Sequence, residues 1–182
     1  MLKKQLLTLA GVLAILACGA CFMPPLPQHH AALPPGLSSV HSIAIDVEDG
    51  TANHLFDPIM MSKAAAGNFN NLWSEFPVRA EAFNGAGASD ADLRITVLSK
   101  TASCNPEGNG KQFCSFEMVA SFTVRAADGT TLQSSPRKSS KFGVWFKGDS
   151  LPDNLNASPF QQQASYSLAM TAGEMLFYTR SQ

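Results

Sequence analysis

Alternating apolar and polar side chains between Phe116 and Arg125 are the feature that most limits how this chain can fold. Successive side chains of a β-strand point to opposite faces, so this alternation predicts a strand with one buried face. The intervening residues are Glu117, Val119, Ser121, Thr123 and Arg125. We expect that semi-polar face of the sheet to meet either solvent or a partner.

Similar segments predict further strands at residues 40–47, 78–83, 93–98 and 142–146, the last after a tight turn at Asp128-Gly129. Two segments have helical spacing instead. In the first, Asp57 is a predicted N-cap before Pro58, and apolar residues recur every three or four positions until Phe76. The second opens with a capping box at residues 158–161 and carries the apolar stripe Phe160, Ala164, Leu168, Ala172, Met175 and Leu176.

The predicted order is therefore β-α-β-β-β-β-α. Two helices with one apolar face each suit one face of a sheet, so we predict an α/β (α+β) two-layer sandwich with a mostly antiparallel sheet of four to five strands. The chain of 182 residues, less a leader, suffices for one domain. Its net charge of −1 and the lack of an RNA- or DNA-binding motif argue against nucleic acid as a partner.

An export signal is predicted at the N-terminus, where two lysines precede an apolar run from Leu6 to Ala17. That run is shorter than the roughly 20 residues of a membrane-spanning helix. It ends in the sequence ILAC, which is similar to a bacterial lipobox, whose cysteine receives lipid after cleavage. We predict a signal peptide at 1–17, a proline-rich tether at 18–36 and a single domain at 37–182.

Cys18 is the predicted lipidation site, with Cys21 as the alternative. Cys21 would place a cysteine and a glycine where a lipobox has an aliphatic and a small residue. The Cys18-x-x-Cys21 spacing also occurs in redox and metal sites, but no second pair and no strand-turn-helix pattern accompany it. His29-His30 is interpreted as solvated tether. The other two cysteines, Cys104 and Cys114, flank a glycine-rich turn sequence, and in an exported protein we expect them to form a disulfide.

No catalytic site, metal site or cofactor is predicted. His41 is expected on the core-facing side of the first strand and His54 in the following loop, and no G-x-S-x-G elbow supplies a nucleophile. A hydrolase using either histidine is the enzymatic alternative. The acidic residues Asp46, Glu48 and Asp49, with His54 and Asp57 nearby, lack the ligand order of a calcium loop and are interpreted as a solvated turn.

One basic cluster stands out in the hairpin region after Asp128-Gly129, and it consists of Arg137, Lys138 and Lys141. Lysines on a sheet edge discourage unwanted strand pairing, which is one interpretation. The other is an anion-binding tip for a phosphorylated lipid, such as lipopolysaccharide, or for an acidic loop of a partner.

The element order and several segments resemble the lipopolysaccharide-assembly lipoproteins of the LptE type. The resemblance rests on the lipobox and tether, with Ala20 after Cys18-Gly19 where an aromatic residue is common, and on LPPGLSSVHSIAIDVEDGT, SDADLRITVLSKTAS and FEMVASFTVRAADGTTL. It implies a non-enzymatic, lipid-anchored protein of the outer membrane that faces the periplasm. The implied partner is an LptD-like β-barrel translocon that inserts lipopolysaccharide, and direct lipopolysaccharide contact is the hypothesis for the basic cluster. The alternative is an auxiliary or binding lipoprotein of an exporter complex with the same fold.

Overall fold

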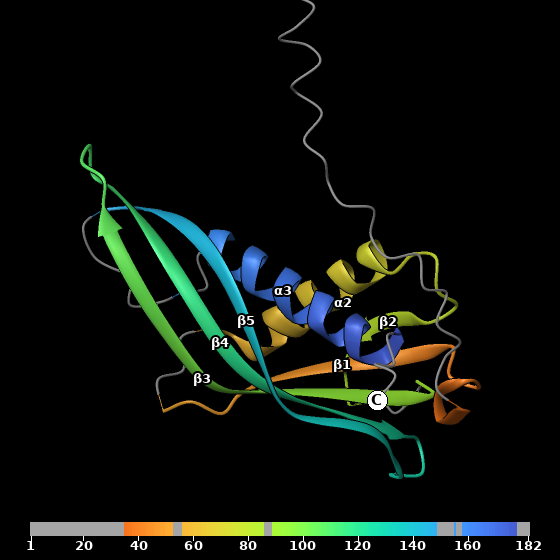
Figure 1. Ribbon diagram of the computed structural model, residues 1–182. Coiled ribbons are helices and arrows are strands. Elements are labelled where there is room, and N and C mark those ends of the chain that lie inside the picture. Colours follow the sequence, from red (N-terminus) through yellow and green to blue (C-terminus); the bar gives the residue numbers. More distant parts are fainter. Residues whose placement is uncertain (1–34, 53–55, 86–88, 149–154, 156–157, 178–182) are drawn as a thin grey trace, which may run out of the picture. The chain divides into compact units, whose positions relative to one another are not determined.

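A five-stranded sheet covered by two helices forms the domain in the computed structural model (Figure 1). The described residues are 35–52, 56–85, 89–148, 155 and 158–177, all within the unit that spans residues 31–182. In chain order the elements are η1 (Pro35–Leu37), β1 (Ser42–Asp49), α2 (Pro58–Leu72), β2 (Arg79–Ala82), β3 (Ala91–Pro106), β4 (Lys111–Ala126), β5 (Thr131–Lys147) and α3 (Ser158–Phe177). The predicted order and the two-layer α+β class are confirmed.

The sheet is mixed, with strand order β2-β1-β3-β4-β5. β1 pairs in parallel with both β2 and β3, because α2 supplies the crossover that parallel neighbours require. The β3–β4 and β4–β5 pairs are antiparallel. These antiparallel ladders are the longer ones, since β3, β4 and β5 contain 16, 16 and 17 residues.

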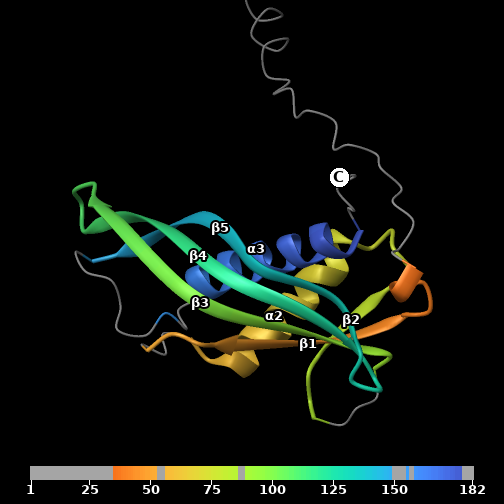
Figure 2. The same ribbon diagram turned by 60° about the horizontal axis from the view of Figure 1, so that its bottom comes forward.

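Both helices lie on the same side of the sheet, as the two views in Figures 1 and 2 agree. The alternation of apolar and polar residues along β4 explains why one face of the sheet is covered. Even-numbered residues of β4 from Gln112 to Val124 are buried, and all but Gln112 belong to one hydrophobic core with the apolar stripe of α3 and the buried face of α2. No helix among the described residues is long and apolar enough to cross a membrane.

Asp57 caps α2 as predicted, since its carboxylate accepts the backbone N–H groups of Ile59 at 2.8 Å and Met60 at 3.3 Å. The helix ends at Leu72, earlier than the apolar spacing predicted. The next residue, Trp73, leaves helical geometry, and its indole Nε1–H donates to the backbone carbonyl of Ala169 in α3 at 3.1 Å. Trp73 therefore links the end of α2 to α3 through this hydrogen bond instead of extending α2.

The turn predicted between the two cysteines is shorter in the structure. β3 continues to Pro106 and β4 begins at Lys111, so only residues 107–110 connect them. Cys104 and Cys114 are direct cross-strand partners with Cα atoms 4.0 Å apart, and they form a disulfide. Pairing through these residues extends the hairpin well beyond the strand predicted at 93–98.

Candidate interaction surface

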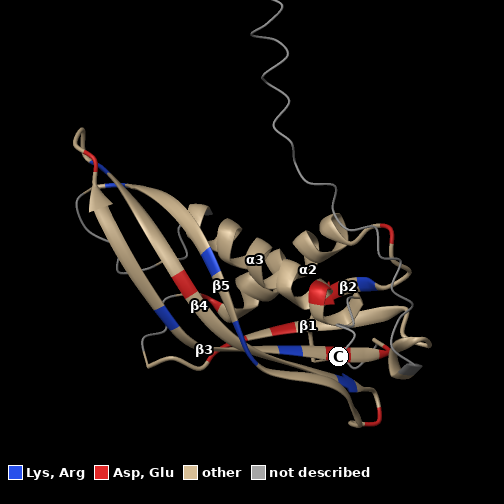
Figure 3. Ribbon diagram, viewed as in Figure 1, with Lys and Arg blue, Asp and Glu red and all other residues tan. Residues whose placement is uncertain are grey.

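The sheet face turned away from the helices is its outer face, and it is uncovered in the described domain. Odd-numbered residues of β4 lie there, including Ser121 and Thr123, beside Thr96 and Arg94 of β3. The Arg94 guanidinium lies 3.7 Å from the Asp46 carboxylate and 3.5 Å from that of Glu48. Figure 3 shows blue and red segments interspersed over the strands. Around these residues the outer face is polar and mixed in charge, as predicted for a surface open to solvent or a partner.

The ends of β3 and β4, together with the end of β5, extend past the helices in both ribbon views (Figures 1 and 2). We call this part the distal ribbon and define it as residues 99–106, 111–118 and 139–147. Its helix-facing side is packed, because the Phe116 ring lies 5.4 Å from that of Phe142 and 4.9 Å from that of Phe160 in α3. The helix-facing side of the distal ribbon is therefore packed against the start of α3 through aromatic rings.

On its outer face the distal ribbon presents an aromatic pair and a groove. Phe113 is the direct cross-strand partner of Trp145, and their ring centroids are 5.1 Å apart. The Phe113 ring lies over Gly143, where a Cβ atom would come within 2.2 Å of it. Beside this ring runs a groove of about 490 Å³, whose lining includes Ser103, Ser115 and Glu117. The groove floor is open because the row Ser103, Ser115 and Gly143 has small side chains.

The predicted basic cluster is divided in the structure and does not lie at a hairpin tip. Arg137, Lys138 and Lys141 all lie within β5, an edge strand. Lys141 pairs with Glu117 on the outer face at 3.7 Å, whereas Lys138 pairs in register with Ala120, whose side chain faces the helices. Positions three apart on a strand point to opposite faces, which the prediction of a cluster overlooked.

The acidic residues around the end of β1 are used in ion pairs and caps. The Asp49 carboxylate is fully buried and lies 2.8 Å from the Lys100 ammonium, which also sits 5.3 Å from the Phe56 ring centroid. Burial alone would raise the pKa of Asp49, but hydrogen bonds from Lys100 and Thr51 outweigh it and hold that pKa below its ordinary value. Among the described residues no group of three His, Cys, Asp or Glu side chains is placed to hold a metal ion.

Asp46 differs from Asp49, because partial burial and the nearby Glu48 carboxylate raise the pKa of Asp46, while Arg94 lowers it.

His41 was expected to face the core, and that prediction is wrong. His41 is exposed just before β1, and its backbone N–H donates to the Asp90 carboxylate at 2.8 Å. β1 begins at Ser42, two residues after the predicted start at residue 40, and the Asp90 carboxylate accepts the backbone N–H groups of both His41 and Ser42.

Several predicted features lie outside the described residues. They are the signal peptide at 1–17, the lipidation candidates Cys18 and Cys21, the His29-His30 pair and His54. Conversely, sequence reasoning missed the Phe113–Trp145 pair. The strand containing Trp145 was predicted, but its register against β4 depends on two irregularities in the β4–β5 ladder that no local pattern marks.

No protein-family model matches this sequence, and no curated protein matches it either. Among solved structures, a PelC dodecamer from Paraburkholderia phytofirmans aligns with a TM-score of 0.39 and 10% identity, covering 76% of this chain and 88% of that one. A minor lipoprotein from Acinetobacter baumannii gives 0.37 and 8%, covering 75% and 90%. The rare lipoprotein B from Shewanella oneidensis gives 0.30 and 9%, covering 74% and 90%. Two of these three neighbours are thus bacterial lipoproteins by description.

Proposed function

We propose that this protein is a lipid-anchored lipoprotein of the outer membrane that binds the lipopolysaccharide-inserting β-barrel and assists lipopolysaccharide assembly. The observation that carries the proposal is the uncovered outer face of the sheet, on a chain whose residues 15–18 are similar to a lipobox. Thr96, Ser121 and Thr123 offer hydroxyl groups across neighbouring strands of that face. Hydroxyl groups and exposed ion pairs lose little on desolvation compared with isolated charges, so such a face suits contact with a polar barrel wall.

The proposed role is non-enzymatic. A hydrolase needs a nucleophile, a base and an orienting group that converge in one place. His41, the one described histidine, lies at the domain surface with its backbone held by Asp90. Replacing His41 and His54 together with alanine should leave function intact, whereas loss of function in a folded variant would favour the hydrolase.

Site-specific crosslinking in the native envelope tests the proposal. A photoreactive residue at Ser121, on the outer face, should capture a large β-barrel protein. The matched control is the same residue at Lys63, which is exposed on the helix layer and should capture none. Capture of inner-membrane transporter components from Ser121 would instead favour the alternative, an auxiliary lipoprotein of an exporter complex. Equal capture of the barrel from both positions would refute the role of the outer face.

The proposal includes a weak lipopolysaccharide contact along the edge strand β5, where Arg137, Lys138 and Lys141 project from both faces. Reversing all three charges should weaken lipopolysaccharide binding in a salt-sensitive way, because exposed charges are screened at high ionic strength. Unchanged binding at low salt would reject this contact.

A further inference from the structure

We propose that the outer face of the distal ribbon is a membrane-contacting site, which docks on an anionic phospholipid surface through Lys111, Phe113, Trp145 and Lys147. This inference goes beyond the proposed partner and rests on the proposed lipid anchor only for proximity to a bilayer. It is carried by the juxtaposition of two aromatic rings with two lysines that form no ion pair with a described carboxylate, at one end of the domain.

The two lysines lie directly opposite each other. Lys111 pairs in register with Lys147, one row beyond the Phe113–Trp145 row on the same face. Like charges directly opposite on a sheet destabilise it, so this arrangement calls for a compensating anion. Within the described residues no carboxylate lies within 4.0 Å of either ammonium group. An anionic surface would supply the missing charge.

The aromatic residues give this charged end an apolar component. Trp145 is 52% exposed, the most exposed aromatic side chain among the large hydrophobic residues of the described chain. A tryptophan ring is amphipathic and is enriched at the level of lipid headgroups. Phe113 packs against it, so the two rings form one surface beside a groove of about 460 Å³. The charged residues that line this groove are two lysines, Lys111 and Lys147, and one carboxylate, Glu107, so its formal charge is positive.

The combination of exposed rings and paired lysines indicates an anionic bilayer as the occupant. An apolar peptide would match the two rings but would leave the lysines uncompensated. A small free anion would match the lysines but would leave Trp145 exposed. A bilayer with anionic headgroups satisfies both, because the lysine stems reach the headgroup phosphates while the rings enter the interface.

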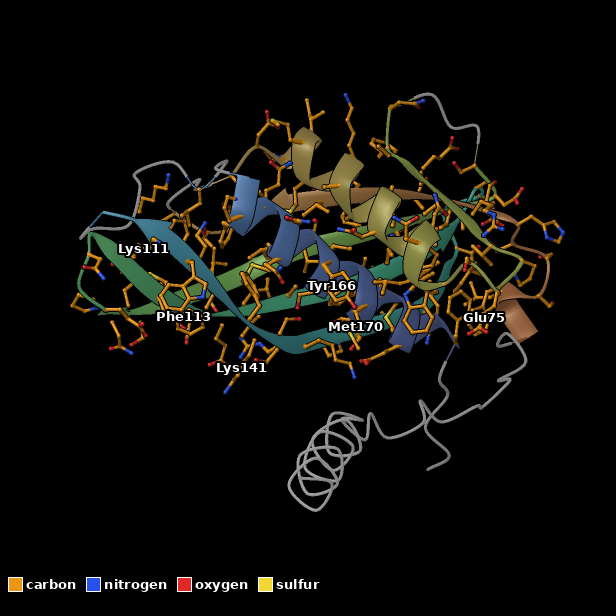
Figure 4. The ribbon with its side chains drawn as sticks, turned by 90° about the horizontal axis from the view of Figure 1, so that it is seen from above. Glu75, Lys111, Phe113, Lys141, Tyr166 and Met170 are labelled. Carbon is orange, nitrogen blue, oxygen red and sulfur yellow. A yellow bond between two sulfur atoms is a disulfide. The ribbon has the colours of Figure 1, made fainter. Side chains whose placement is uncertain are left out.

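The geometry of the domain permits this contact. Figure 4 shows Lys111 and Phe113 at one end of the domain and Glu75 near the other, so the rings lie on a projecting end that the helix layer leaves free. The predicted tether at residues 18–36 spans up to about 60 Å when extended. The proposal requires a tether of that reach to let this end of the domain touch the leaflet that holds the anchor.

Tryptophan fluorescence tests the proposal, because Trp145 is one of two tryptophans and the other, Trp73, is buried. The purified full chain, as isolated from membranes, is placed in vesicles of equimolar phosphatidylcholine and phosphatidylglycerol. The phosphatidylcholine is brominated on its acyl chains, so that it quenches only rings that enter the bilayer. We expect bromine quenching of Trp145 fluorescence in these vesicles and less quenching in vesicles of brominated phosphatidylcholine alone. The Trp145→Phe variant should lack this quenching, because its remaining tryptophan, Trp73, is buried.

The lysines are tested by Lys111→Gln with Lys147→Gln. Each lysine near an anionic surface contributes on the order of 1 kcal/mol, so the bound-to-free ratio of the ribbon should fall about 30-fold. The matched control is Lys63→Gln with Arg79→Gln, which removes the same charge from exposed positions outside the distal ribbon and should leave quenching unchanged.

Absence of Trp145 quenching in anionic vesicles would overturn the proposal, as would equal loss in the control variant. An emission shift of Trp145 on adding polyglutamate, without quenching by vesicles, would assign the surface to an acidic protein segment instead. Barrel capture from Ser121 is measured separately, so failure of the membrane contact and failure of the proposed partner are distinguishable.

Discussion

Two helical glycines, Gly173 in α3 and Gly67 in α2, should respond to alanine with opposite signs. A Cβ atom at Gly173 would lie 2.0 Å from Cε2 and 2.1 Å from Nε1 of the Trp73 indole, whereas an ordinary contact is 3.4–4 Å. The indole has no free direction, because it is buried and packs against Phe177 with centroids 5.6 Å apart. Gly173→Ala must therefore displace the ring and disturb the hydrogen bond to the Ala169 carbonyl.

The magnitude follows from three effects. Overpacking a core costs about 1–3 kcal/mol, and loss of the indole hydrogen bond costs about 1 kcal/mol. Alanine gains about 1 kcal/mol over glycine within a helix. We expect Gly173→Ala to lower the free energy of unfolding by about 2 kcal/mol. For a domain of this size, the corresponding fall in the unfolding midpoint temperature is about 4–8 °C.

Gly67→Ala is the matched control, because nothing lies within 4 Å of a Cβ atom there. This variant should gain about 1 kcal/mol from helix propensity alone. Urea unfolding followed by circular dichroism measures both variants under the same conditions. A Gly173→Ala variant as stable as the wild type, or more stable, would refute the packing of Trp73 against α3.

Three further changes test other parts of the domain. Cys104→Ala with Cys114→Ala should lower the free energy of unfolding by about 3 kcal/mol, the loop-closure effect of a disulfide across ten residues; a loss below about 0.5 kcal/mol in urea unfolding would contradict this value. Lys100→Met leaves the buried Asp49 carboxylate without its cation and should cost about 3 kcal/mol, most of it recovered when Asp49→Asn is added; equal losses in the single and double variants would count against the ion pair. Since the pKa of Asp49 is lowered in the folded state, its contribution is fully present above the ordinary carboxyl pKa and is lost as pH falls through the lower folded value. Unfolding measured from about pH 7 down to about pH 3 should therefore show a smaller acid loss for Asp49→Asn than for the wild type, and parallel curves would reject the assignment.

The parts of the fold that were predictable depend on local signals. Asp57 was identified as a cap because capping acts within three residues, and the buried stripe of α3 was identified because its period is that of a helix. The buried face of β4 was identified because its apolar and polar residues alternate with the period of a strand. In each case the residues that form the sequence pattern also form the helix cap, helix or strand that the pattern predicts.

The parts that were missed depend on residues distant in sequence. Gly67 and Gly173 look alike along the chain, and only the packing of Trp73, just after the end of α2, against Gly173 separates them. The basic residues of β5 looked like a cluster, but the strand assigns Lys138 and Lys141 to opposite faces. The pairing of Lys111 with Lys147 also depends on a register that no local pattern fixes. The candidate membrane contact therefore required the structure.

Acylation of Cys18 is the central claim, since both the proposed partner and the membrane contact assume a chain fixed at a bilayer. Metabolic labelling with radioactive palmitate measures it most directly, in cells that express the wild type or the Cys18→Ser variant. We predict a labelled wild-type chain and an unlabelled variant that no longer fractionates with the outer membrane. An unlabelled wild-type chain, or a variant that is labelled and fractionates as the wild type does, would contradict the account.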